Sequence, residues 1–307
     1  MDPNALYLAE EVAENHRDGH FSRREAMRRL AYLGFSAVGA SALLAACGDG
    51  KKDTASSQAT TTVAPVVTTA PGPTTTGPPV ATQNITYPGK GHTVMGVFAP
   101  AASPKGAVLV IHENRGITDF VRTITGKIAG SGYTALAVDL LSPQGGTAAH
   151  PDPAELQSVL LGNAQEVGGT AVDDTKSSLE ELQRRAPGQK LGATGFCFGG
   201  NMVWALLAAG DPPPLSAAVP FYGQTNNPLF GKSKAAVLAI YAELDTRVNA
   251  NQAQARLGLE TAKLTFDMKT FPGVNHAFMN NTGAAYNQVQ ADAAYAAMMD
   301  WFGRYLK

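Results

Sequence analysis

A cysteine within a glycine-rich segment is the first residue of this chain that could do chemistry. Cys197 is the third residue of segment 195–200 (Gly-Phe-Cys-Phe-Gly-Gly), between the apolar run 190–194 and the helical pattern 201–209. A strand that turns sharply into a helix crowds the backbone, so small residues must flank the central one, whose side chain then projects above the sheet. The positive end of the following helix would favour the thiolate. The segment therefore predicts a nucleophile elbow, the alternative being an ordinary buried cysteine.

A nucleophile needs a base and a residue that orients the base, and after an elbow these follow in the order acid, histidine. Asp245 comes after the apolar run 236–241, and His276, the one histidine beyond Cys197, comes after the run 264–271. Loops at the carboxyl ends of parallel strands meet at one edge of the sheet, so both side chains should lie beside Cys197. The sequence predicts a catalytic triad in which Asp245 orients His276. A loop-capping role is the alternative for Asp245.

Charge and histidine spacing argue against several other kinds of site. With 24 basic and 25 acidic residues the formal charge is -1, which gives no field that would attract nucleic acid. We therefore expect no nucleic-acid partner. The remaining histidines lack partners at metal-ligand spacing, so neither a metal nor any other cofactor is predicted. These histidines are His16, His20, His92, His112 and His150.

Short apolar runs alternate with longer helical patterns beyond residue 87. This alternation predicts an α/β fold, with a doubly wound, mostly parallel sheet and helices on both faces. The predicted strands cover 107–111, 134–138, 190–195, 217–222 and 236–241. The predicted helices cover 120–131, 173–185, 201–209, 251–259 and 284–305.

Residues 88–307 resemble the dienelactone hydrolase family of the α/β-hydrolase superfamily along nearly their whole length. The resemblance rests on segments 110–116 (Val-Ile-His-Glu-Asn-Arg-Gly), 195–200, 244–245 (Leu-Asp) and 273–278 (Gly-Val-Asn-His-Ala-Phe), and 220–223 (Pro-Phe-Tyr-Gly) also matches a strand end. Members of this family hydrolyse a cyclic enol ester without a metal or organic cofactor. The resemblance therefore implies an α/β-hydrolase fold and a hydrolase of lactones or small carboxylic esters.

The resemblance also assigns roles to residues around the predicted triad. In the family, a glutamate at the position of Glu113 pairs with the resting cysteine and helps convert it to thiolate when substrate binds. Backbone N–H groups of Phe198 and Asn114 would hold the oxyanion. An exposed loop carboxylate is the alternative for Glu113.

Two departures from the family concern the substrate. The archetype binds its substrate's carboxylate with one arginine after the Asp-Leu that follows the third strand and another soon after the catalytic histidine. Here Asp139-Leu140 leads into Leu-Ser-Pro-Gln, and segment 276–278 leads into Met279-Asn280. Without these guanidinium groups the bidentate contacts that specify a carboxylate are lost. The nearby Arg115 is a candidate replacement. The other residues expected to contact substrate are Tyr222 and Phe278.

Residues 1–47 are predicted to be a leader and export signal. A basic start at 22–29 precedes an apolar stretch at 30–46, and the adjacent arginines at 23–24 resemble a twin-arginine signal. The stretch ends in Leu-Ala-Ala-Cys, which resembles a bacterial lipobox with Cys47 as the lipidated residue. Residues 48–87, rich in Thr, Pro and Ala, predict a disordered tether. The alternative for 30–46 is an ordinary amphipathic helix.

These observations predict a lipid-anchored enzyme on the outer face of the bacterial cytoplasmic membrane, or a periplasmic or secreted one. Its partners would be the membrane, through Cys47, and a small ester or lactone substrate, and we expect a monomer. Two alternatives stay open. One is a general carboxylesterase or thioesterase that uses the same triad. The other is an inactive hydrolase-like domain that serves as a surface-anchored binding lipoprotein.

Overall fold

A computed structural model of the chain describes Ala9, Val12, Ala13, His16 and residues 22–32, 34–46, 77–165, 170–209 and 214–307. The chain divides into two compact units, Met1–Thr74 and Thr75–Lys307. The first contains helices α2 (Arg23–Tyr32) and α3 (Ala37–Ala46), which share a small apolar cluster. None of the described helices combines the length and apolar character needed to cross a bilayer. The predicted lipidation residue Cys47 and most of the predicted tether lie outside the described residues.

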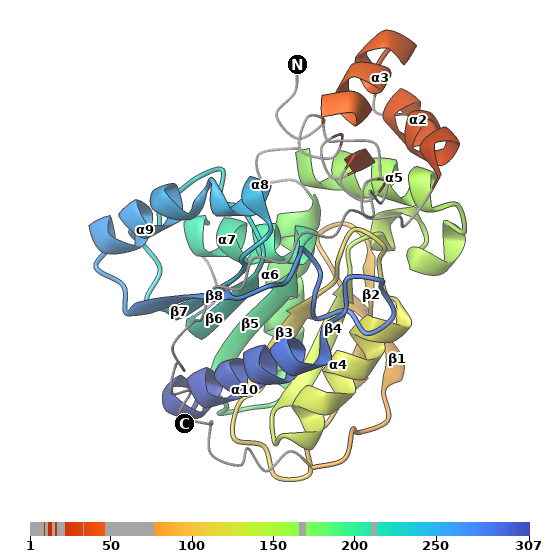
Figure 1. Ribbon diagram of the computed structural model, residues 1–307. Helices are drawn as coiled ribbons and strands as arrows, with labels where there is room; N and C mark the ends of the chain where they lie inside the picture. The colour runs from red at the N-terminus through yellow and green to blue at the C-terminus, as the bar shows by residue number, and fades with distance from the viewer. Residues whose placement is uncertain are drawn as a thin grey trace. The chain divides into compact units, whose positions relative to one another are not determined.

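The second unit is built on an eight-stranded sheet with the order β1-β2-β4-β3-β5-β6-β7-β8 (Figure 1). Strand β2 pairs antiparallel with β1 and β4, and all other pairs are parallel. The predicted doubly wound, mostly parallel sheet is confirmed. The strands are β1 (Gln83–Pro88), β2 (Thr93–Ala99), β3 (Ala107–Ile111), β4 (Thr134–Asp139), β5 (Leu191–Phe196), β6 (Leu215–Phe221), β7 (Ala236–Ala242) and β8 (Phe266–Phe271).

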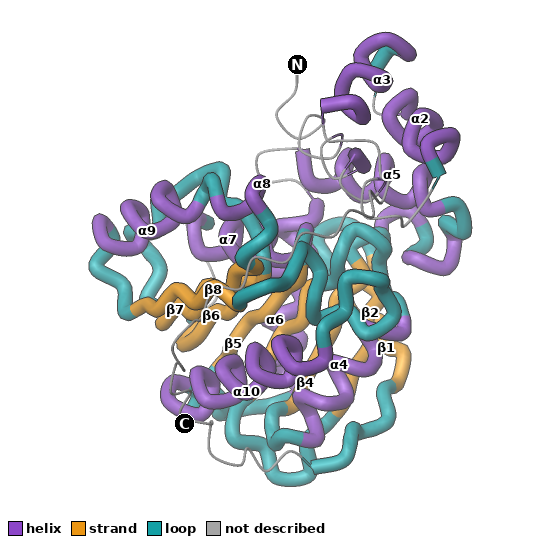
Figure 2. The backbone as a smooth tube through the Cα atoms, in the orientation of Figure 1, coloured by secondary structure: helices purple, strands orange, loops and turns teal. Residues whose placement is uncertain are grey.

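Helices cover both faces of this sheet (Figures 1 and 2). Helices α4 (Asp119–Gly130) and α10 (Gln288–Tyr305) pack on one face, and α6 (Thr170–Arg185) and α7 (Phe198–Ala208) pack on the other. The described part of the unit also contains α5 (Pro153–Gln165), α8 (Thr246–Asn249), α9 (Gln252–Thr261) and the 3-10 turns η1 (Ser142–Gln144) and η2 (Thr147–Ala149). Helix α5 and strands β1 and β2 were not predicted from the sequence.

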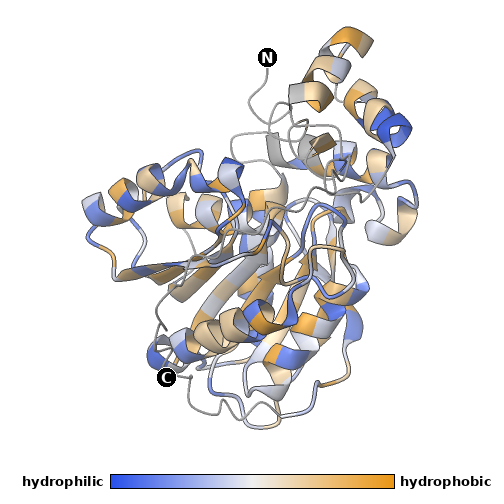
Figure 3. Ribbon diagram, in the orientation of Figure 1, coloured by the Kyte–Doolittle hydropathy of each residue, from blue (hydrophilic) through white to orange (hydrophobic). Residues whose placement is uncertain are grey.

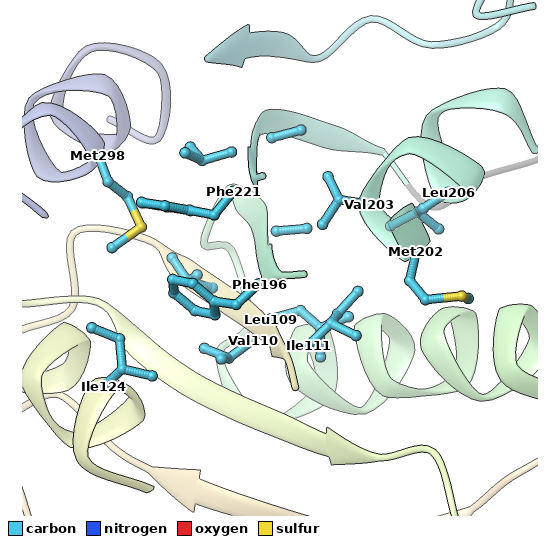
Figure 4. Packing of buried hydrophobic residues seen from close by; sticks show 14 of the residues in the cluster. Leu109, Val110, Ile111, Ile124, Phe196, Met202, Val203, Leu206, Phe221 and Met298 are labelled. Carbon is cyan, nitrogen blue, oxygen red and sulfur yellow. The ribbon is translucent and has the colours of Figure 1, made fainter. Parts of the chain in front are cut away.

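The core lies between the sheet and these two helix layers. Figure 4 shows Ile124 of α4 and Met298 of α10 on one side of the central strands, and Val203 of α7 on the other. Phe196 on β5 packs against Phe221 on β6, with ring centroids 4.8 Å apart. Figure 3 shows the strands as mainly hydrophobic, whereas hydrophilic residues interrupt the outer helices. Burial on both faces explains why the central strands are continuous apolar runs.

Strand β1 begins before residue 88, and both its start and the contact of Val80 lie within the segment predicted as a tether. The N–H of Val80 donates to the carbonyl of Gly126 at 3.0 Å, and β1 then starts at Gln83. The approach requires glycine on α4, because a Cβ on Gly126 would lie 2.4 Å from the Val80 oxygen. The sequence did not predict strand β1, because an edge strand with one exposed face needs few apolar residues and its composition resembled that of the Thr- and Pro-rich segment before it.

The sheet topology places two predicted site residues next to each other. Strand β3 lies between β4 and β5, so the chain winds first to one side of β3 and then to the other. Ile111, the last residue of β3, pairs with Gly195 near the end of β5. A crevice opens at the carboxyl ends of strands where the winding direction reverses. Glu113 and Cys197 follow these two strands and therefore stand at the switch point.

The turn between β5 and α7 is possible only with glycine at its crowded positions. A Cβ on Gly195 would lie 2.1 Å from the carbonyl oxygen of Gly199, across the turn. A Cβ on Gly199 would lie 2.2 Å from the carbonyl oxygen of Ile111, and one on Gly200 would lie 2.5 Å from that of Phe221. All three obstructing atoms belong to backbone, which cannot rotate away. The turn therefore packs directly against the backbone at the ends of β3 and β6.

We expect Gly199→Ala to lower the free energy of unfolding by about 1–3 kcal/mol or more, because the added methyl must displace β3 or α7. The measurement is urea unfolding followed by circular dichroism. Gly231→Ala is the matched control, since a Cβ there meets nothing within 4 Å, and its stability should stay within about 0.5 kcal/mol of the parent. Equal stabilities of the two variants would contradict the close approach.

Candidate active site

Cys197 occupies the tip of the strand-to-helix turn in a strained backbone conformation. It is the N-cap residue of α7, with φ 57° and ψ -116°. Its N–H donates to the Phe221 carbonyl at 3.1 Å, which ties the turn to β6. The residue is only 3% exposed. A non-glycine residue persists at positive φ only where its surroundings fix it, and such positions cluster at functional sites.

Asp245 and His276, predicted from separate loops, are in direct contact. The Oδ2 atom of Asp245 lies 2.5 Å from Nδ1 of His276. The other carboxylate oxygen caps α8 by accepting from the Val248 N–H at 3.1 Å. Burial alone would raise the pKa of Asp245, but the charge and hydrogen bond of His276, together with Arg247 and the Val248 N–H, lower it below the usual value. Asp245 is therefore an ionised carboxylate that contacts the imidazole with one oxygen and caps helix α8 with the other.

Hydrogen bonds join the loops that carry these two residues. The N–H of Leu244 donates to the Val274 carbonyl at 3.0 Å, and the N–H of Gly273 donates to Oε2 of Glu243 at 2.7 Å. Each bond links the segment after β7 to the segment after β8. The positions of Asp245 and His276 relative to each other are thus fixed by the loops as well as by their own contact.

Tyr222 lies at the centre of the site, against His276. Its ring centroid is 4.9 Å from that of His276 and 5.7 Å from that of Phe278. Burial raises the pKa of the Tyr222 hydroxyl well above its ordinary value, and the nearby charges of Glu113 and Cys197 raise it further. Tyr222 and Phe278, both predicted to contact substrate, are fully buried. The tyrosine therefore packs against the histidine and lies close enough to the carboxylate and the thiol for their charges to affect its pKa.

Glu113 is buried and has a partner that the sequence did not reveal. Only 6% of the residue is exposed, so it is not an exposed loop carboxylate. Its Oε2 accepts from the side-chain amide of Asn280 at 2.6 Å. The amide oxygen of Asn280 accepts from the N–H and the hydroxyl of Thr282, at 2.9 Å and 2.7 Å. These two bonds orient the amide so that its NH2 group faces Glu113.

Asn114 and Phe198, predicted to supply oxyanion donors, lie in the segments after β3 and β5. Phe198 is the first residue of α7, where backbone N–H groups have no partner inside the helix. Asn114 is 7% exposed and follows Glu113 in a turn. Within the described parts of the chain, no backbone hydrogen bond outside helices and strands uses either N–H. Arg115, in contrast, is exposed.

Backbone strain marks the same region. Among the described residues, four other than glycine have positive φ, and Cys197, Tyr222 and Ala277 are three of them. Ala277 directly follows His276. The described part of the chain contains no cluster of three or more His, Cys, Asp or Glu side chains that could hold a metal ion. A thiol at the elbow and a carboxylate-oriented imidazole on a loop at the same edge of the sheet are groups that could serve nucleophilic attack.

The sequence profile of the dienelactone hydrolase family matches residues 95–306. The chain belongs to the dienelactone hydrolase family. It is 26% identical, over 73% of its own length and 99% of the relative, to a protein of Saccharolobus solfataricus provisionally named carboxymethylenebutenolidase. As a member of this family, the protein is a hydrolase.

Solved structures agree with this assignment. A dienelactone hydrolase, so named provisionally, from Klebsiella pneumoniae superposes with a TM-score of 0.62 at 25% identity, covering 74% of this chain and 99% of that chain. A dienelactone hydrolase-like promiscuous phosphotriesterase from metagenomic libraries superposes with a TM-score of 0.65 at 22% identity, covering 75% of this chain and all of that one. At that lower identity the likeness supports the fold alone.

Replacing Asn280 tests the bond that holds Glu113. In Asn280→Ala the buried carboxylate loses its donor, so the free energy of unfolding should fall by about 1–3 kcal/mol. Urea unfolding at neutral pH measures the change. Asn281→Ala, the same substitution at the neighbouring exposed residue, should alter stability by no more than about 0.5 kcal/mol. A similarly small effect of both substitutions would show that the bond contributes little.

Proposed function

We propose that the protein hydrolyses a lactone or small carboxylic ester through a covalent intermediate on Cys197. The observation that carries the proposal is the strained elbow at Cys197 together with the 2.5 Å contact between His276 and the buried Asp245. A thiol at a helix N-terminus is favoured as thiolate, and an imidazole held by a carboxylate can accept and return a proton. Family membership supports the same class of reaction.

In the proposed mechanism His276 holds the proton taken from the thiol. The Cys197 thiolate attacks the substrate carbonyl carbon, which forms a C–S bond and places a negative charge on the carbonyl oxygen. The N–H groups of Phe198 and Asn114 stabilise this oxyanion. The C–O bond of the ester then breaks, and His276 gives its proton to the leaving alkoxide. Water attacks the thioester while His276 takes a proton from it, and the acid product leaves as the thiolate is restored.

The absence of the two arginines that bind the substrate's carboxylate in the family archetype favours an uncharged substrate. The family resemblance gives Glu113 the task of helping Cys197 to ionise, and its position after β3, the strand next to β5, fits that task. Asn280 donates a hydrogen bond to Glu113 but carries no charge. The two arginines with which the family archetype binds its substrate's carboxylate have no counterpart in segments 139–144 and 276–280, so a carboxylate on the substrate would lack those bidentate contacts. We infer that neutral esters and lactones react faster than those bearing a carboxylate near the carbonyl.

Incubation of the full-length chain with activated esters and enol lactones tests the reaction. We expect an acyl adduct on Cys197 by peptide mass mapping, with neutral substrates reacting faster than matched carboxylate-bearing ones. Cys197→Ala and His276→Ala should each lose at least about a hundredfold in kcat/KM, because each removes a member of one catalytic unit.

The outcomes also separate the alternatives. Fast turnover of thioesters or of unrelated esters would favour a general thioesterase or carboxylesterase. The absence of any adduct and any turnover across the panel would make the binding lipoprotein the better account. Unchanged turnover in Cys197→Ala would refute the cysteine mechanism while leaving the hydrolase class intact.

We also propose that the hydrolase is exported and anchored to the outer face of the bacterial membrane by lipid on Cys47. The support comes from the sequence: a basic start, an apolar stretch and the Leu-Ala-Ala-Cys ending. The linker from 48 to 76 would hold the domain away from the bilayer. A periplasmic or secreted form without lipid would follow if Cys47 is not modified.

Fractionation of bacteria that express the full chain tests the anchor. The parent should sediment with membranes and Cys47→Ala should move to the soluble fraction, because burial of acyl chains contributes about 0.8 kcal/mol per methylene. Cys197→Ala is the matched control, since it removes the other cysteine and should stay with membranes. Equal distribution of parent and Cys47→Ala would rule out lipid attachment at this residue.

A further inference from the structure

His112 is a fully buried histidine beside the site, and the mechanism above does not use it. It follows the last residue of β3 and precedes Glu113, and none of its surface is exposed. It therefore has no access to substrate. Its two ring nitrogens nevertheless contact backbone groups of two different segments, at Glu113 and at Leu140.

The hydrogen bonds of the ring fix its tautomer. The N–H of Leu140 lies 3.1 Å from Nε2 of His112, and a backbone N–H can only donate, so Nε2 must accept. Nδ1 therefore carries the hydrogen and donates to the Glu113 carbonyl, 2.5 Å away. Burial lowers the pKa of His112, although the nearby Asp139 carboxylate acts in the opposite direction, so the ring is held in its neutral form.

The carbonyl that His112 holds belongs to the same peptide unit as the N–H of Asn114. In a planar trans peptide the C=O and N–H point in opposite directions, so fixing one direction fixes the other. No cis peptide bond occurs in the described residues. A donor to the Glu113 oxygen therefore sets the direction of the Asn114 N–H, which points away from the His112 ring.

His112 also lies against the elbow. Its ring stacks on that of Phe198, with centroids 6.5 Å apart and planes 17° apart. A Cβ on Gly199 would lie 2.7 Å from the carbonyl oxygen of His112, so the start of α7 packs directly on this backbone. One residue thus touches both segments that would supply oxyanion donors.

We propose that His112 is a positioning residue for the oxyanion hole: by donating to the Glu113 carbonyl and accepting from Leu140, it aims the N–H of Asn114 at the carbonyl oxygen of the substrate. This inference rests on the proposed function, because it assigns a role within the same acylation step. Asn114 is the donor, and His112 acts only through it. The competing explanation is a histidine that merely fills the core with both nitrogens satisfied.

Two reactions of Cys197 separate these explanations. Acylation by p-nitrophenyl acetate forms a C–S bond through a tetrahedral oxyanion and releases p-nitrophenolate, so it needs the donor. Alkylation by iodoacetamide forms a C–S bond at the CH2 carbon as iodide leaves, and no tetrahedral oxyanion forms. Both rates depend on the thiolate and on access to it. The ratio of the two rates therefore reports on the oxyanion donors.

We would measure both rates at Cys197 in the full chain, His112→Leu and His112→Asn. Leu fills much of the space but makes neither bond, whereas the Asn amide can still donate to the Glu113 carbonyl. In His112→Leu acylation should slow by about tenfold or more while alkylation changes by less than about threefold, and His112→Asn should recover part of the loss. His92→Leu, which removes the histidine that contacts buried Asp174 of helix α6 from the bend between β1 and β2, should leave the ratio unchanged.

Each remaining outcome has a definite meaning. A parallel loss of acylation and alkylation in both variants would show a structural role only and overturn the inference. Unchanged acylation in His112→Leu would do the same while leaving the proposed function in place. If the parent chain itself acquires no acyl group on Cys197, the proposed function fails, and the inference fails with it.

Discussion

Close backbone packing around the turn at Cys197 is the constraint on which the site depends. Gly199 and Gly200 allow the turn to lie within contact distance of β3 and β6, and Gly195 allows the turn to close on itself, because a Cβ at any of the three would collide with a carbonyl oxygen. The turn therefore cannot move independently of the strands that carry Glu113 and Tyr222. Because backbone atoms rather than flexible side chains make these contacts, the sheet itself holds the thiol, the carboxylate and the aromatic ring in place.

The loops that carry Asp245 and His276 are positioned by hydrogen bonds between them and not by close backbone packing. Asp245 and His276 lie on loops after β7 and β8. In the strand order these two strands and β3 are on opposite sides of β5. Two bonds between these loops and the contact between the two side chains fix their geometry. Tyr222 follows β6 and packs against His276. Tyr222 and Ala277 both have positive φ. Such a conformation persists in a residue other than glycine only where the surrounding structure fixes it.

The sequence predicted the central parallel strands, which are buried on both faces, but it missed the edge strand β1, its neighbour β2 and helix α5. The run at 107–111 is a strand as expected, since only a fully buried strand is continuously apolar. Strand β1 lies at the edge with most residues exposed, so its composition matched that of the tether. The bond between Glu113 and Asn280 joins segments far apart in the chain, and no spacing rule predicts it. The sequence shows His112 only as a histidine without partners at metal-ligand spacing. Its actual partners are backbone groups, whose positions come from the fold.

The carboxylates, the thiol and the imidazole around Tyr222 set the charge balance of the site. In the proposed mechanism Glu113, Asp245 and the Cys197 thiolate lie around Tyr222, where all three groups raise the pKa of its hydroxyl, and the proton held by His276 offsets only part of their mutual repulsion. Arg247 favours the ionised form of Asp245, whereas the partner seen at Glu113 is the amide of Asn280, which carries no charge. An anionic group on the substrate would add to this repulsion, while the oxyanion of the transition state would develop where helix α7 and the Phe198 N–H offer positive potential. Under the proposed mechanism, the site would therefore disfavour an added charge on the bound substrate and stabilise the charge that the reaction creates, which is the difference a catalyst must provide.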